Sequence, residues 1–244
     1  MITEDKVIEI FCVMDEFCNN FASECEKNLR LEDKECSHRN RRGKLSVSEI
    51  MTILVCYHFG SFSNFKHYYL FYVRQHLAGS FPDAVSYNRF VELMPRVFFH
   101  MMPFMKLPGF GKCSGISFVD STMIPVCHNL RRYANRVFKG MATDGKGTMG
   151  WCYGFKLHLV HGLRANMKNR LMSMWDKIML RKRCIIECIN DLLKNKANIV
   201  HSRHRSIHNF IMNISSALTA YSFFDNKPQA LPVHVEHSTQ LALF

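Results

Sequence analysis

The sequence lacks several features that would place the protein in common classes. None of its ten cysteines forms a C-x-x-C pair, so a zinc knuckle is not expected. No run approaches the roughly 20 apolar residues that a membrane-spanning helix needs. The first residues, MITEDKVIEIF, lack the basic start and apolar stretch of a secretory signal. We therefore expect reduced thiols, a cytoplasmic location and no membrane partner.

Acidic residues are scarce in the middle of the chain. Residues 101–210 hold 19 basic and 5 acidic side chains, whereas the whole chain has a net charge of +12. A positive field concentrated in this way suits a polyanion, most simply nucleic acid, although a merely basic protein would show the same charge. The 48% hydrophobic content is enough for a packed core, and 244 residues allow one large or two small domains.

The first third of the chain has the pattern of short helices. Apolar residues recur at steps of three and four from Val7 to Phe21, and Ser46 with Glu49 predicts a capping box. The segment NFKHYYLFYVRQHL predicts another helix, with its aromatic residues in the core, and Ser86 predicts a cap for the next one. Residues 1–110 are thus expected to form a helix-turn-helix-like DNA-binding module, although any small helical bundle would give this pattern.

The pattern changes after LPGFGKCSG, at residues 107–115, where we place a domain boundary. The segments 115–120 and 154–160 predict strands, and the glycine-rich stretch between them predicts a hairpin or a loop. Helices are expected again after about residue 168, and one of them, NFIMNISSALTAYSFF, is apolar enough to pack inside. The expected fold class is α+β, with domains at 1–110 and 111–222 and a tail at 223–244.

One carboxylate, Asp120, stands directly after the apolar run GISFV, which predicts that it ends a buried strand. A charge in that position is costly unless a basic side chain, backbone N–H groups or a metal ion meets it. Glu187 lies on the polar side of a predicted helix, four residues from Arg183 and from Asp191. Taken alone, it would be read as an ordinary solvated residue.

A series of motifs bears on these two carboxylates. In order they are SFVDST, VCHN, VFKG, GTMGW, GFKLHL, NMKN, DKIMLRKRCIIECINDLLKN and HSRHRS. Together they resemble the core of DDE transposases from bacterial insertion sequences, most closely those of the insertion-sequence 982 family. The resemblance extends to LSVSEIMTIL, NFKHYYLFYV and VSYNRFVELM in the first third.

The resemblance implies a ribonuclease H-like catalytic domain in which three carboxylates hold two divalent metal ions, Mg²⁺ or Mn²⁺. Asp120 matches the first aspartate and Glu187 the glutamate of that set. Two such cations can activate a nucleophile and stabilise the leaving oxygen during strand cleavage and transfer. The family further implies DNA as partner at the terminal inverted repeats, a homo-oligomer, and a nucleoid-associated location in a bacterium. Basic residues expected to contact DNA phosphates are Lys139, Lys156, Arg181, Lys182 and Arg183.

The family's second aspartate has no counterpart here, because GFKLHLV is followed at once by HGLRANMKN. Only Asp144 and Asp176 lie between Asp120 and Glu187, and neither matches the missing position. We therefore expect an internally deleted copy with an incomplete ribonuclease H-like domain and impaired catalysis. The alternative is a DNA-binding remnant that cleaves nothing, or an inhibitor of full-length transposase.

Two further groups have both a functional and an ordinary interpretation. Phe138, Trp151 and Tyr153 could stack on bases, but aromatic residues that border strands more often belong to the core, which is our expectation. His201, His204 and His208 have the spacing of metal ligands, but the interleaved arginines favour a basic helix start instead.

Overall fold

The computed structural model describes residues 2–29, 43–60, 62–109, 118–147, 150–161, 184–200 and 204–227. Helices dominate the part before residue 110. They are α1 (Glu4–Leu29), α2 (Val47–Cys56), η1 (Tyr57–Phe59), α3 (Phe65–His67), η2 (Tyr68–His76), α4 (Tyr87–Leu93), η3 (Met94–Val97) and α5 (Phe98–Gly109). None of the helices in these ranges is both long and apolar enough to cross a membrane.

The helix starts in this part follow from their capping residues. The Ser46 side chain accepts a hydrogen bond from the backbone N–H of Glu49, whose carboxylate accepts from the N–H of Ser46, so the predicted capping box is confirmed. Ser86 caps α4, as predicted, through its side chain alone, which accepts from the backbone N–H of Arg89. The aromatic segment forms the π-helix η2. Its tyrosines, Tyr68, Tyr69 and Tyr72, are buried, which confirms their predicted place in the core, whereas Phe71 is 49% exposed and the prediction is wrong for it.

A small antiparallel sheet and further helical segments follow in the described part of the chain. The strands are β1 (Phe118–Cys127), β2 (Thr143–Gly147) and β3 (Gly150–His161), with the 3₁₀ helix η4 (Asn129–Ala134) between β1 and β2. The helical segments are α7 (Cys184–Asp191), η5 (Leu192–Lys196) and α8 (Ile207–Ser222). In the described part the strand order is β1-β3-β2, so the predicted hairpin is present as β2 and β3. The α+β class is confirmed.

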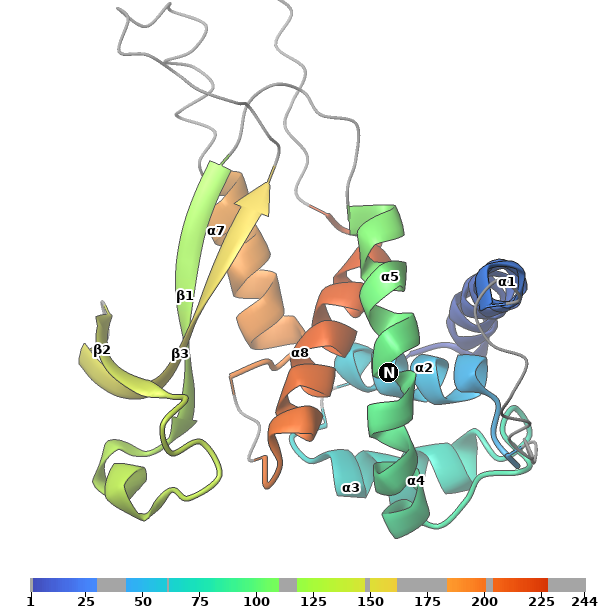
Figure 1. The fold of residues 1–244 in the computed structure, drawn as a ribbon, viewed down its shortest axis with the longest axis horizontal. Helices are drawn as coiled ribbons and strands as arrows, with labels where there is room; N and C mark the ends of the chain where they lie inside the picture. Colours follow the sequence, from blue (N-terminus) through green and yellow to red (C-terminus); the bar gives the residue numbers. More distant parts are fainter. Residues whose placement is uncertain are drawn as a thin grey trace, which may run out of the picture.

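Helix α8 lies between the sheet and the N-terminal helices (Figure 1). At its start, the Phe210 ring lies 5.1 Å from that of Phe155 in β3 and 5.2 Å from that of Phe138. Towards its other end, Thr219 contacts the sulfur of Met101 in α5. The small buried residues along α8 let neighbouring helices approach closely, and one cluster of buried residues spans both parts of the chain. The prediction that this helix packs inside is confirmed.

A buried histidine joins three of these elements. His58 in η1 is 1% exposed. Its Nδ1 lies 2.7 Å from the carbonyl oxygen of Ala197, and its Nε2 lies 2.9 Å from Oγ of Ser216 in α8. A carbonyl can only accept, so Nδ1 carries the proton. In the neutral imidazole Nε2 accepts from the Ser216 hydroxyl, whose single proton can also go to the carbonyl oxygen of Asn213 at 3.0 Å. The neutral imidazole is therefore fully hydrogen-bonded, which makes its burial tolerable.

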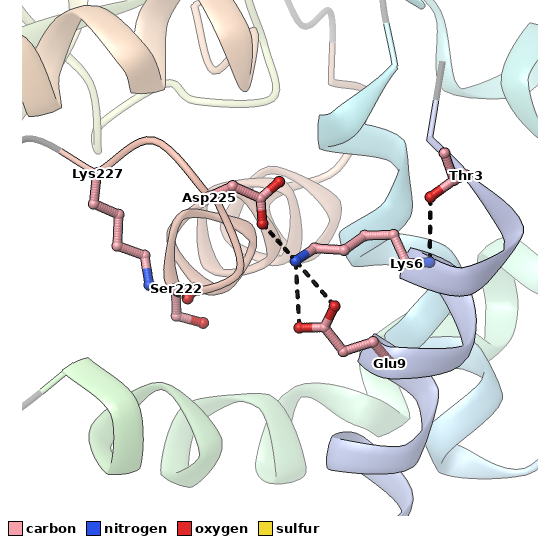
Figure 2. A network of polar contacts seen from close by, with 6 residues as sticks. All are labelled: Thr3, Lys6, Glu9, Ser222, Asp225 and Lys227. Atoms are coloured by element: carbon pink, nitrogen blue, oxygen red, sulfur yellow. Dashed lines mark hydrogen bonds and ion pairs between the residues drawn. The ribbon is translucent and has the colours of Figure 1, made fainter.

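The start of α1 is tied to the end of α8 by a surface ion pair (Figure 2). The Lys6 ammonium lies 2.8 Å from Asp225 and 3.0 Å from Glu9. The hydrogen bond from Lys6 lowers the pKa of Asp225, and the same bond raises the pKa of Lys6. Because these groups are close to solvent, the contact positions the two helix ends more than it stabilises them.

Acid should destabilise the fold through its buried histidines. Burial lowers the pKa of His58 and that of His204 to about 4, whereas an unfolded histidine titrates near 6.5. Between these values the unfolded chain binds more protons, so the free energy of unfolding falls as the pH falls from about 6.5 towards 4. For His58 the loss is expected to reach about 3 kcal/mol, at about 1.4 kcal/mol per pKa unit. Urea denaturation at a series of pH values measures it.

The matched variants are His58→Gln and, at an exposed position of α8, His208→Gln. His58→Gln should be less stable at neutral pH but should show a shallower dependence on pH. His208→Gln should keep the wild-type slope. An unchanged slope in His58→Gln would show that this histidine does not titrate as its burial implies.

Candidate functional site

Asp120 lies near the start of a strand and not at its end. Strand β1 runs from Phe118 to Cys127, so the prediction that Asp120 ends its strand is wrong. Beyond Asp120 every second residue is buried, as Thr122 and Ile124 show, which is the pattern of a strand. The chain therefore stays extended and paired with β3. Pro125 is tolerated because β1 is at the edge of the described sheet and its register shifts just after this residue.

The side chain of Asp120 meets an amide. Side chains of β1 alternate between two faces, and Asp120 shares its face with Thr122 and Ile124. Helix α7 lies against this strand (Figure 1). From α7, Nδ2 of Asn190 donates a hydrogen bond of 2.6 Å to Oδ2 of Asp120. A side-chain amide is not among the partners that the sequence predicts for this carboxylate, which are a basic side chain, backbone N–H groups or a metal ion.

Asn190 could have been found from its position. It is 5% exposed and stands on the apolar stripe of α7, one residue after Ile189 and three before Leu193, which are both buried. An amide on a buried stripe needs a hydrogen-bonding partner, and this points to a polar group on the opposing element. Its Oδ1 and the Oγ1 of Thr122 are buried and have no hydrogen-bonding partner within the described ranges.

Glu187 lies on the same helix, one turn before Asn190. It is exposed, on the polar side of α7 as predicted. It lines an open groove between α7 and the end of α8, together with Cys188, Asp191, Leu192, Asp225, Asn226 and Lys227. The structure therefore brings the strand of Asp120 and the helix of Glu187 into contact, with Asn190 between the two elements.

A third carboxylate is needed for a two-metal site of the DDE kind, and Asp144 cannot supply it. It lies on β2 opposite Tyr153, which pairs with Cys127 at the far end of β1 from Asp120. Asp144 is therefore about seven residues along the sheet from Asp120, which corresponds to roughly 20 Å. Carboxylates that share a pair of catalytic ions must lie much closer together, because the ions are only about 4 Å apart. Asp144 also forms a 3.2 Å ion pair with Arg132. Asp176 is outside the described residues.

The described residues do not fit a pair of metal ions. Within the ranges that the structure describes, no group of three or more His, Cys, Asp and Glu side chains is placed to hold one ion. The Asn190 amide group takes one carboxylate oxygen of Asp120, and an N–H donor there competes with a cation. This part of the chain thus provides a held carboxylate on a strand and an exposed carboxylate on the facing helix.

The basic residues predicted to contact DNA lie on different surfaces. Lys139 is exposed in the turn before Gly140, whose φ of +82° favours glycine. Lys156 is exposed on β3 and pairs with Met123, so it lies on the face of the sheet opposite to that of Asp120. Arg181, Lys182 and Arg183 lie outside the described residues.

The three aromatic residues predicted to be core residues have different environments. Phe138 is 1% exposed, which confirms its prediction. Tyr153 is half-buried, and its hydroxyl donates to the carbonyl oxygen of Phe138. Trp151 is 64% exposed, so the prediction for this residue is wrong. It precedes the part of β3 that packs against α8, so no helix within the described ranges covers its ring.

Replacing Asn190 by aspartate should destabilise the protein at neutral pH. Asn190→Asp places two carboxylates at hydrogen-bonding distance in a buried position, which raises the pKa of one of them. A raised folded-state pKa gives stability that is present at low pH and lost as the pH rises. We expect a loss of about 1–3 kcal/mol at pH 7 that shrinks towards pH 4, measured by urea denaturation in EDTA.

Asn195→Asp is the matched control. Asn195 donates to the Asp191 carboxylate at 2.5 Å, but both residues are exposed. Solvent screens the added charge there, so a change within about 0.5 kcal/mol is expected. Equal losses in the two variants would show that the contact between Asn190 and Asp120 has no special role.

Comparison with known proteins adds one finding. Residues 110–163 and 159–207 match, as two segments, the family model described as a transposase DDE domain. No curated protein and no solved structure matches the chain. The two segments together span residues 110–207, about two fifths of the chain, and include both Asp120 and Glu187. Over this part the chain is similar to the DDE domain of transposases, and the similarity supports a transposase function.

Proposed function

We propose that the protein is a DNA transposase of a bacterial insertion sequence, of the insertion-sequence 982 type, whose strand cleavage and transfer are impaired. The observation that carries this proposal is the contact between the strand of Asp120 and the helix of Glu187, within the part that matches the DDE domain. In this reading, Asp120 and Glu187 are the remaining ligands for Mg²⁺ or Mn²⁺ in a ribonuclease H-like domain.

The charge of the chain supports DNA as the partner. Residues 101–210 hold an excess of 14 positive charges, and Lys139 and Lys156 present theirs to solvent. Exposed lysine and arginine side chains attract and position the phosphate backbone of DNA but do not read its base sequence. We propose that Arg181, Lys182 and Arg183 also contact DNA phosphates and that the terminal inverted repeats are the natural target.

Two observations support impaired cleavage. The family match is divided into two segments that meet at residues 159–163, where the sequence analysis places the missing aspartate segment. The sheet offers only Asp144 as a further acid in its described strands, and this residue lies near the other end of the sheet, in an ion pair. We propose that the deleted segment carried the second catalytic aspartate.

A second candidate is a DNA-binding remnant that cleaves nothing and acts as an inhibitor of full-length transposase. The hydrogen bond from Asn190 to Asp120 favours it, because an N–H donor occupies a carboxylate oxygen that a metal ion would otherwise use. The two candidates share the DNA-binding surface and differ in catalysis alone.

A cleavage and binding assay tests both parts of the proposal. The full chain is incubated with a plasmid that carries the ends of its own insertion sequence, in MgCl₂ or MnCl₂. We expect a gel shift that weakens steeply with salt and cleavage no greater than that of Asp120→Asn and Glu187→Gln. Both variants keep the size of the side chain, and Glu187 is exposed, so the second variant should fold normally.

The outcomes separate the two statements. Metal-dependent cleavage that both variants lose would show that the enzyme is active, and the proposal of impairment would fail. Absence of a gel shift at low salt, with no cleavage, would remove the transposase proposal itself.

A further inference from the structure

The hairpin of β2 and β3 and the helix η4 form one surface at the end of the sheet away from Asp120. Nδ2 of Asn129 donates a 2.5 Å hydrogen bond to the carbonyl oxygen of Trp151, which joins η4 to β3. Nη1 of Arg132 lies 3.2 Å from Oδ2 of Asp144, which joins η4 to β2. In Figure 1, the hairpin and the segment before it extend beyond the helices that cover the rest of the sheet.

This hairpin surface exposes large apolar side chains that nothing in the described part covers. Trp151 is 64% exposed, and Tyr133 and Leu130 in η4 are 86% and 88% exposed. By contrast, the rings of Phe155 in β3 and of Phe138 in the turn before β2 pack against Phe210, so aromatic residues are covered where α8 reaches them. Grouped exposed rings of this kind are typical of a binding site.

Positive charge surrounds these rings. Lys146 stands directly opposite Trp151 in the hairpin register, and such cross-strand pairs have their Cβ atoms about 5 Å apart. The Arg132 guanidinium lies 4.5 Å from the centre of the Tyr133 ring. Further basic side chains nearby are exposed, namely Arg131, Arg136 and Lys139. The one acid between residues 128 and 156 is Asp144, which Arg132 already pairs.

We propose that the hairpin surface binds a single-stranded DNA segment, with unpaired bases stacked on Trp151 and Tyr133 and phosphates held by Lys146 and the nearby arginines. The inference rests on the proposed function, which makes DNA the partner. Base faces are accessible only where the duplex is open, since stacking hides them within it. Exposed rings beside cations match this chemistry, because each base offers a face for stacking and each phosphate a negative charge.

Binding of an oligo-dT and of a duplex of equal length to the full chain tests the inference. Trp151→Ala should weaken oligo-dT binding about five- to hundred-fold, the effect of losing one stacked base, and should change duplex binding less than about two-fold. Trp151→Phe should restore most of the affinity. Lys146→Ala should reduce the slope of log K against log salt by about one.

Phe99→Ala is the control, because Phe99 is an equally exposed ring on α5, outside the hairpin surface. It should change neither affinity. If Trp151→Ala leaves oligo-dT binding unchanged while the chain still binds duplex, the inference fails and the proposed function stands. If the wild type binds neither DNA, both fail. If Trp151→Ala abolishes binding to vesicles of anionic lipid but not to oligo-dT, the surface is a membrane contact and the inference fails.

Discussion

The arrangement of this protein depends on the burial of α8 on two sides. Its first turns present Phe210 to the sheet, and its later turns lie against α5 and η1. A helix can pack against elements on two sides only if its side chains are apolar or small nearly all round. Eight residues of α8 are buried, and most of them are small or carry a hydroxyl group. The sheet is thereby held at a defined distance from the N-terminal helices.

The position of α7 follows from the same packing. Leu193, one turn after Ile189, belongs to the buried cluster, and His58 holds the carbonyl of Ala197 just beyond. These contacts set α7 beside β1 and leave Asn190 facing Asp120. The candidate site is thus an interaction between two elements whose places are decided elsewhere in the core. Its carboxylate is stabilised by an amide, which offers hydrogen bonds but no charge.

The two ends of the sheet differ in their surroundings. One end carries Asp120 and is covered by α7, so Thr122 and Asn190 are buried there and Asp120 is half-buried. The other end extends past the helices and leaves aromatic and basic side chains exposed. A strand ladder spaced at about 3.3 Å per residue keeps these surroundings roughly 20 Å apart. Interactions with a long polymer can use both ends, whereas a small ligand would meet only one.

Local signals in the sequence were sufficient for several elements. The serine caps at Ser46 and Ser86, the hairpin and the buried tyrosines of η2 depend on residues close together in the chain, so their prediction succeeded. The length of β1, the partner of Asp120 and the exposure of Trp151 depend on which distant element lies opposite. Only the tertiary structure decided these, because periodicity identifies a residue's face but not what covers it.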